Sequence, residues 1–186
     1  MSHFEYVSIA VALIYALVVG RLLTGLGPSI EERRRYPIQI AWILTLFLVC
    51  IFSWWQLWTT REVEWTALRF LWILAMPSLL YIRVAILTGS DPREIDSFRD
   101  HFFSNRLSFF GMGVATAAYI VFSPWIYGGV PWLSFAPVHT SAIMLGTLSI
   151  AGLIFRQQSA HWVIVLLALS GMALSFVLLG QIAVSQ

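Results

Sequence analysis

The sequence contains little charge and no lysine. All eleven basic residues are arginine, and Asp and Glu together number nine. Charged residues make up 11% of the chain and hydrophobic residues 59%, whereas about 25% of an ordinary soluble domain is charged. This composition excludes an ordinary soluble domain and predicts a membrane protein. The arginines lie beside apolar runs, where they commonly set orientation, so nucleic acid is not an expected partner.

Cysteine is also scarce. Cys50 is the one cysteine in the chain, and it falls in the middle of an apolar run. A disulfide framework is therefore excluded, and the thiol is expected to pack as a small apolar group. The opening residues MSHFEY lack the basic region of a signal peptide, so we expect the first apolar run to be retained.

Recognisable catalytic patterns are missing. No GxSxG, HExxH or Walker sequence occurs. The histidines fall on opposite sides of the predicted membrane, His3 and His139 on one and His101 and His161 on the other, without the close spacing of metal sites. The sequence therefore predicts no catalytic, metal-binding or cofactor-binding residue.

Six apolar runs account for most of the chain, at residues 4–26, 38–60, 66–88, 107–126, 137–155 and 160–181. A bilayer core about 30 Å thick requires about 20 apolar helical residues. Unpaired backbone groups are not tolerated in hydrocarbon. We therefore expect an all-α polytopic membrane protein, a six-transmembrane-helix bundle forming a single domain over 1–186. An inverted repeat of three helices plus three is an open alternative.

Arginine placement predicts the orientation. Nine arginines fall at one set of helix ends, and Arg61 and Arg69 fall at the other. The positive-inside rule places the nine in the cytoplasm, so both termini are expected in the periplasm of a bacterial inner membrane. The nine are Arg21, Arg33, Arg34, Arg35, Arg83, Arg93, Arg99, Arg106 and Arg156.

The link after the third run carries a helix-start pattern. Asp91 suits an N-cap, Pro92 the first helical position, and Glu94 completes a pattern like a capping box. Apolar and charged residues then alternate with a helical period. We expect a cytoplasmic interfacial helix before the fourth span, with a partner-docking helix as the alternative, and nothing between Phe103 and Ser108 prevents it from running unbroken into that span.

The first run contains two charges, Glu5 and Arg21, about 24 Å apart along a helix. Arg21 is expected to snorkel to the cytoplasmic surface. Small and polar residues follow Glu5 at intervals of three or four: Ser8, Ala12, Ala16, Gly20 and Thr24. This stripe predicts either a close-packing face, with Arg69 as the partner of Glu5, or a narrow water path with Glu5 at its mouth.

The segment CIFSWWQLW in the second run is rich in tryptophan. Trp54, Trp55 and Trp58 suit an aromatic belt at the outer interface. Gln56 shares a helical face with Ser53 and Gln39, which predicts either a hydrogen bond to another helix or an aromatic-walled pocket in which Gln56 holds a ligand. The candidate residues of a solute path or pocket are Glu5, Ser8, Arg69, Ser53, Gln56 and Trp55.

Ionisable residues are missing from the middles of the predicted spans. Arg69 and Arg83 lie about 21 Å apart on the third run, and each is expected to reach an interface. Ion-coupled pumps and voltage sensors place charges within the span. Their absence argues against proton-coupled transport and voltage sensing.

Three segments carry a family resemblance: FEYVSIAVALIYALVVGRLLTGL, RRRYPIQIAWILTLFLVCIFSWWQLW and DSFRDHFFSNRLSFFG. They resemble short multi-pass bacterial inner-membrane proteins of unknown function, over about the first two thirds of the chain. The resemblance implies a bacterial inner-membrane location and assigns no activity.

Two functions are compatible with the pattern. One is passive movement of a small solute or ion, through the chain or a homo-oligomer of it. The other is a structural or accessory subunit that binds a membrane-protein partner. The second rests on small residues of the fourth and sixth runs, which serve helix contacts: Gly111 and Ala115, Gly113 and Ala117, and Gly171 and Ser175.

Overall fold

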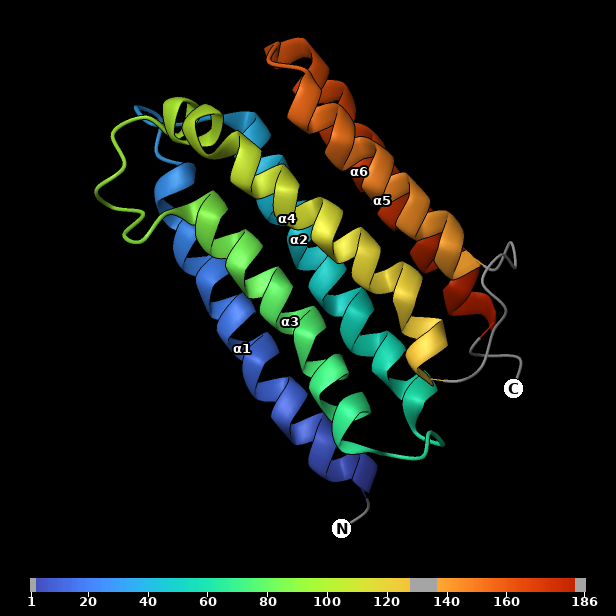
Figure 1. Cartoon of the computed structure of the whole chain (residues 1–186). Helices are drawn as coiled ribbons and strands as arrows, with labels where there is room; N and C mark the ends of the chain where they lie inside the picture. The colour runs from blue at the N-terminus through green and yellow to red at the C-terminus, as the bar shows by residue number, and fades with distance from the viewer. Residues whose placement is uncertain (1–2, 128–136, 183–186) are drawn as a thin grey trace.

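The protein is helical in every element of the part that the structure describes. The computed structural model describes the backbone of residues 3–127 and 137–182, and the side chains of 3–127 and 140–176. The elements, shown in Figure 1, are α1 (His3–Ser29), α2 (Pro37–Gln56), a short 3-10 helix η1 (Leu57–Thr60), α3 (Ala67–Thr88), α4 (Phe98–Tyr127), α5 (Pro137–Ile154) and α6 (Gln158–Ile182). The predicted all-α class is confirmed.

Five stretches of the described chain are long and apolar enough to cross a membrane. They are α1, α2 together with η1, α3, α4, and α6 over Gln158–Phe176. In α5 the described side chains cover a shorter apolar stretch, Thr140–Ile154. These lengths and compositions are consistent with a multi-pass membrane protein.

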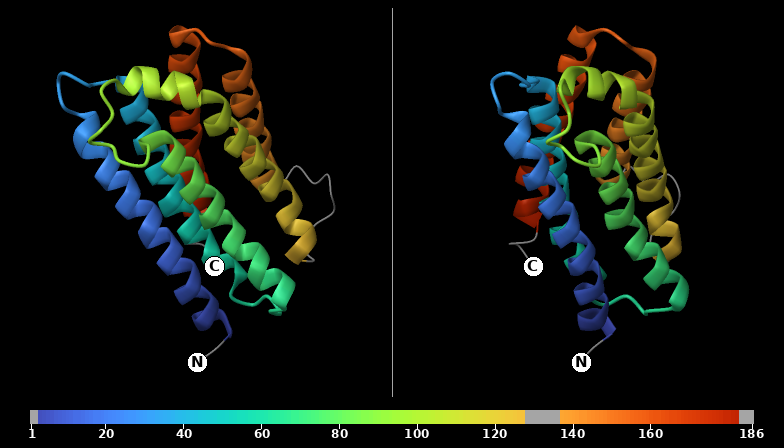
Figure 2. Two further views of the ribbon diagram at one scale, coloured as in Figure 1. Left: turned by 60° about the vertical axis from the view of Figure 1, so that its left-hand side comes forward. Right: turned by 90° about the vertical axis from the view of Figure 1, so that its left-hand side faces the viewer.

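The six helices form a closed ring. Successive helices run in opposite directions (Figures 1 and 2). α1 packs on α2 and α3, α3 packs on α4, α4 on α5, α5 on α6, and α6 returns to α2. The links 30–36, 89–97 and 155–157 gather at one end, which we call the arginine-rich end. The opposite end, where α1 and α3 begin, is the N-terminal end.

α1 packs through branched and aromatic side chains. Val7, Val11, Tyr15, Val18 and Leu22 are buried at steps of three or four residues. The small-residue stripe does not face the core, since Glu5, Ala16, Gly20 and Thr24 are exposed, and a Cβ atom at Gly20 would contact nothing within 4 Å. Larger side chains bury more apolar area, and this decides which face turns inward.

The prediction that a helix starts at Asp91 is wrong. Residues 89–97 are turns, and α4 begins at Phe98, where the Ser97 hydroxyl accepts from the Asp100 amide at 3.3 Å. Asp91 instead closes a local turn: its carboxylate accepts from the Arg93 amide at 2.9 Å. The second half of the segment expected to form a separate helix is the start of α4, which lies across the arginine-rich end and then runs unbroken into the bundle (Figure 2).

Aromatic rings fill the interior at the arginine-rich end. Phe102, Phe109 and Phe110 are each at most 2% exposed and pack against Trp42 and His161. The Trp42 and Phe109 rings meet edge-on at 5.1 Å between centroids, a favoured aromatic geometry. We call these five residues the aromatic core. It leaves the bundle closed at this end.

Candidate functional site

Arg21 caps the end of a neighbouring helix. Its guanidinium donates to the carbonyls of Gly89 and Ser90, the latter at 3.2 Å, and to the Thr88 hydroxyl at 3.2 Å. α3 ends at Thr88, and Gly89 has a φ of +72°, a conformation that favours glycine. The last carbonyls of a helix lack partners within the helix. Arg21 therefore stabilises the end of α3.

Arg106 does the same for α5. It is 5% exposed, and its Nη1 donates to the carbonyls of Gly152, Leu153 and Phe155 at 2.7, 2.8 and 2.8 Å. A cation at a helix C-terminus also interacts favourably with the helix dipole. We call Arg21 and Arg106 the capping arginines.

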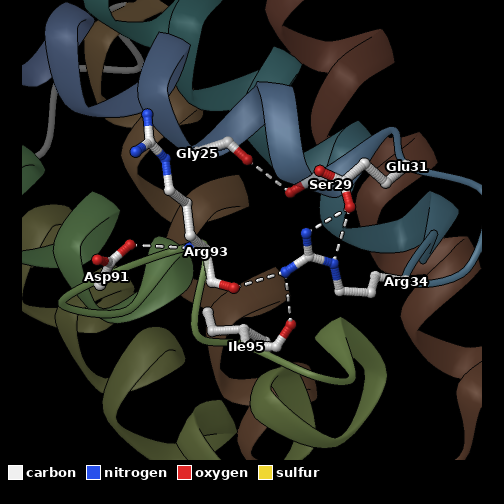
Figure 3. Close-up of polar contacts among 7 residues, drawn as sticks. All are labelled: Gly25, Ser29, Glu31, Arg34, Asp91, Arg93 and Ile95. Atoms are coloured by element: carbon white, nitrogen blue, oxygen red, sulfur yellow. Dashed lines mark hydrogen bonds and ion pairs between the residues drawn. The ribbon is translucent and has the colours of Figure 1, made fainter.

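Arg34 joins two links at the arginine-rich end (Figure 3). Its Nη1 donates to the carbonyls of Arg93 and Ile95 at 2.7 and 3.3 Å, while its other nitrogens pair with the Glu31 carboxylate. The carbonyls of Arg93 and Ile95 are thereby satisfied without a helix. This is a further reason why Asp91 does not begin one.

Arg83 differs from these arginines. It is 3% exposed, and its guanidinium carbon lies 4.5 Å from the Phe109 ring centre and 5.4 Å from that of Trp42. Within the described residues, its Nε and Nη2 atoms have no hydrogen-bond partner. The prediction that Arg83 reaches an interface is wrong. It lies five residues before the end of α3, and the rings of the aromatic core cover it.

Other unpartnered donors lie beside Arg83. Trp42 Nε1 and Ser149 Oγ are buried and have no partner in the described part of the chain. A Cβ built at Gly113 would contact Ser149 Oγ and would lie 3.2 Å from Arg83 Nη2. The Ser149 and Arg83 side chains therefore both pack against α4 at Gly113, where no side chain is present. The fold therefore gathers unpartnered polar atoms here: the Ser149 hydroxyl, which can donate or accept, lies near Arg83 Nη2, and neither makes a hydrogen bond among the described residues.

The energetic cost of this arrangement is large. A buried cation that lacks a counter-charge costs several kcal/mol even after the protein relaxes. Cation–π contacts of the kind made with Trp42 and Phe109 return about 2 kcal/mol when desolvated. The remaining deficit is the kind that an anion or another strong acceptor removes.

A cavity of about 610 Å³ lies inside the ring, and Arg83 is part of its wall. Every one of the six helices contributes to the lining, and the volume is typical of small-molecule sites, which are about 300–1,000 Å³. Trp42 and Gln56 are both in the wall, so the cavity extends along about 21 Å of α2.

The cavity wall has three zones. Arg83, Trp42, Thr45 and Thr116 form its inner end, next to the aromatic core. The middle is mostly apolar, with Val49, Phe52, Ile73, Met76, Ile120 and Leu145, and it also includes the hydroxyl-bearing residues Tyr15, Ser53 and Tyr119. Hydroxyl and amide side chains return at the N-terminal end, with Gln56, Thr59, Thr60, Ser123, Tyr127 and Ser141. Thr59 is exposed, so the part of the wall that the structure describes reaches the surface at this end.

The cavity includes only part of the predicted site. Ser53 and Gln56 line it, while Gln39 donates to the Leu87 carbonyl at 2.6 Å and so joins α2 to α3 as a helix contact.

The other candidates lie apart from the lining that the structure describes. Trp55 is 58% exposed, Glu5 is exposed at the start of α1, and Ser8 donates to the Glu5 carbonyl at 2.9 Å. Arg69 donates to the carbonyls of Ile126 and Glu64 at 3.1 and 2.7 Å.

Sequence reasoning missed Arg83 because it treated position 83 as a helix end. The signal was present: Arg83 lies inside the apolar run 66–88, five residues before its end. An arginine at that depth either snorkels or is retained inside. Only the packing of the aromatic core decides between these outcomes.

Small residues of α4 and α6 contact neighbours within the bundle. Gly113 lies against Ser149, Ala117 lies 3.4 Å from a Cβ built at Gly146, and Gly171 lies against Met144. These faces bring α4, α5 and α6 close together, as small residues do between membrane helices. The faces of Gly113, Ala117 and Gly171 are therefore occupied internally, whereas a Cβ built at Gly111 would meet no described atom within 4 Å.

Tyr36 covers the arginine-rich end just outside the apolar spans. It is 4% exposed, and its ring lies 6.0 Å from that of Phe102. Burial raises the pKa of the Tyr36 phenol to about 12, although nearby Arg99 opposes the shift. The Tyr36 ring thus covers the aromatic core, and its hydroxyl is buried without a hydrogen-bond partner among the described residues.

Comparison of the chain with protein-family models, curated proteins and solved structures finds no match. The resemblance to short multi-pass bacterial proteins therefore stays a prediction. The class supported by the fold is a helical protein with apolar helices of membrane-spanning length. Its function has to be argued from the cavity.

Proposed function

We propose that the protein is a six-span inner-membrane protein that takes a small solute into the cavity between its helices and moves it passively across the bilayer. In this proposal the arginine-rich end faces the cytoplasm. The reason is that nine of the eleven arginines fall, in the sequence, near the helix ends or links of that side. The N-terminal end, where the described part of the cavity wall reaches the surface, then faces the periplasm.

The observation that carries the proposal is the cavity of about 610 Å³ with polar side chains at both ends. Tight packing is the norm in protein interiors, where voids larger than a water molecule are few. A space of this size, with Gln56 at one end and Arg83 at the other, has the form of a binding site.

The closed end favours a carrier over a permanently open pore. Phe102, Phe109 and Phe110 are packed at the arginine-rich end, beyond Arg83, and each is at most 2% exposed. Passage of a solute requires these rings to separate, which makes transport a two-state process. The role of accessory subunit is the second candidate: Gly113 and Gly171 contact helices of the same chain, while a Cβ built at Gly111 would meet no described atom within 4 Å, which leaves that position of α4 available to a partner.

Reagent access to single cysteines tests the proposal. In a Cys50→Ser background expressed in bacterial cells, Ser53→Cys and Gln56→Cys place thiols on the cavity wall. Ile51→Cys is the matched control, because Ile51 is on the same helix but 42% exposed on the outside of the bundle. A charged, membrane-impermeant thiosulfonate should label both cavity cysteines and leave position 51 unlabelled. Equal labelling of all three, or of none, contradicts the proposal.

Flux through reconstituted liposomes tests the transport step. Shrinkage and reswelling after osmotic shock, followed by light scattering, should be faster for a permeant organic solute with the protein than without it. Ala168→Phe narrows the cavity at a lining position and should remove the difference. Glu5→Gln should leave the flux unchanged, since Glu5 lies outside the described lining.

A further inference from the structure

We infer that the inner end of the cavity is an anion site, and that the solute is an amphiphile with one carboxylate and an apolar body. The carboxylate binds the Arg83 guanidinium, and the apolar body lies along the cavity toward the N-terminal end. This inference rests on the proposed function and specifies its substrate class.

The free edge of Arg83 identifies the chemistry of the missing group. The two nitrogens without a partner among the described residues are Nε and Nη2. These atoms form one edge of the guanidinium plane, the fork that binds a carboxylate through two parallel hydrogen bonds. The ring faces are occupied by Phe109 at 4.5 Å and Trp42 at 5.4 Å. The guanidinium is thus held in place with its carboxylate-binding edge unpaired and covered, since Nη2 lies beside Gly113 and Ser149 of the neighbouring helices. A carboxylate that enters from the cavity has to displace this cover to reach the edge.

The charge balance fits a single negative charge. Ion pairs in the described part of the chain join Arg34 to Glu31, Arg61 to Glu62 and Arg99 to Asp100, and none of them involves Arg83. One carboxylate neutralises one buried guanidinium. A second negative charge would remain buried without a partner, at a cost of several kcal/mol.

The cavity wall fits an apolar body behind the carboxylate. Between Arg83 and Gln56 most of the lining is aliphatic, aromatic or methionine, including Val49, Ile73, Met76 and Leu145, with hydroxyl groups from residues such as Tyr15 and Ser53. A small hydrophilic anion would leave this surface in contact with water, whereas a hydrocarbon body would bury it, at about 25 cal/mol per Å². An amphiphile therefore uses both zones of the cavity.

Binding to protein in lipid nanodiscs tests the inference, with labelled decanoate and decanol as matched probes. The two probes have hydrocarbon chains of the same length, but decanoate ends in a carboxylate and decanol in a hydroxyl group. Saturable binding of decanoate to the wild type should be tighter than that of decanol by about tenfold or more, because hydrogen bonds to a charged group contribute that much. Arg83→Met should weaken decanoate by a similar factor and leave decanol unchanged. Arg83→Lys keeps the charge and loses the fork, so its affinity for decanoate should lie between those of the wild type and Arg83→Met.

A second carboxylate distinguishes the source of the ligand. Binding of decanoate but not 4-phenylbutyrate would indicate a lipid-derived acid, and the reverse a water-soluble aromatic acid; either supports the carboxylate site. Equal affinity of wild type for decanoate and decanol, or unchanged decanoate affinity in Arg83→Met, overturns it.

Failure of the anion site is distinguishable from failure of the proposed function. If decanoate and decanol bind equally and Ala168→Phe blocks both, the cavity holds solutes but Arg83 is not an anion anchor. If neither binds and cysteines at positions 53 and 56 resist the thiosulfonate, both proposals are wrong. The comparison of two probes on the wild type needs no variant, so a misfolded Arg83 variant does not leave the question open.

Discussion

The capping arginines and Arg83 show two ways in which one side chain is accommodated in an apolar bundle. Arg106 is 5% exposed and donates to three carbonyls within 2.8 Å. Arg83 is 3% exposed, and two of its nitrogens have no partner in the described residues. Burial is nearly equal, so it does not explain the difference. What differs is whether a helix C-terminus, which has spare carbonyls, lies within reach.

The comparison separates structural arginines from a candidate binding residue. An arginine whose hydrogen bonds are satisfied by the fold contributes to stability, and its loss exposes unpaired carbonyls. An arginine buried without acceptors is a cost to the fold, and such strained or unsatisfied groups gather at functional sites. Four substitutions test whether this distinction holds, and they are ordered from the largest expected loss of stability to a reversal of sign.

Arg106→Met should give the largest loss. It removes a buried cation from three carbonyls at the end of α5, and we expect the free energy of unfolding to fall by about 3 kcal/mol. Thermal or denaturant unfolding in one detergent, followed by tryptophan fluorescence, measures the change. Arg106→Lys, which keeps the charge and three donors, should recover part of it. A loss below about 0.5 kcal/mol would show that water satisfies these carbonyls equally well.

Arg21→Met should give a smaller loss of about 1–2 kcal/mol, because its site is partly exposed and water replaces some of the lost hydrogen bonds. The end of α3 should fray first. Amide exchange of residues 87–90 should therefore speed up more than that of the middle of α3. Uniform acceleration along the helix would mean that Arg21 supports the whole bundle and not the cap.

Arg34→Ala should have little effect on global unfolding, about 0.5 kcal/mol or less, because exposed ion pairs contribute little. Its effect should be local. The links 30–36 and 89–97 lose the contacts that join them (Figure 3), so limited proteolysis in segment 89–97 should become faster. Glu31→Gln is the matched control: it removes the ion pair and keeps the carbonyl contacts, and proteolysis should stay near the wild-type rate.

Arg83→Met should not destabilise the ligand-free protein and is expected to stabilise it by about 1 kcal/mol or more, since an apolar side chain of similar length replaces an unpaired buried charge. The methionine sulfur retains favourable contact with the rings of Trp42 and Phe109. Unfolding in the detergent used for Arg106→Met provides the comparison. A loss of about 3 kcal/mol, equal to that for Arg106, would place Arg83 among the structural arginines and end the distinction.

Much of the helical pattern was predictable from local sequence. Long apolar runs between polar links predicted the helices, and the sequence allowed the continuous passage from the interfacial segment into α4. The start at Asp91 was not, because capping propensity is a local signal, and it competes here with a turn whose carbonyls bond Arg34, far away in sequence.

The candidate site was predictable only in part. Ser53 and Gln56 line the cavity. They could be predicted because helical periodicity shows which residues of α2 share its polar face. Arg83 was assigned to the surface because it lies near the end of the apolar run 66–88, close enough for its side chain to snorkel to the interface. The stripe from Glu5 was misleading because small residues mark close contacts only when a neighbouring helix actually approaches.

The sequence by itself determined the helical class and the apolar helices of membrane-spanning length, because the composition of each run is a local property of that segment. The tertiary structure alone decided which arginines meet helix carbonyls and which one is left beside a cavity. That outcome depends on helix ends and rings brought together from α2, α3, α4 and α5, and no single segment contains it.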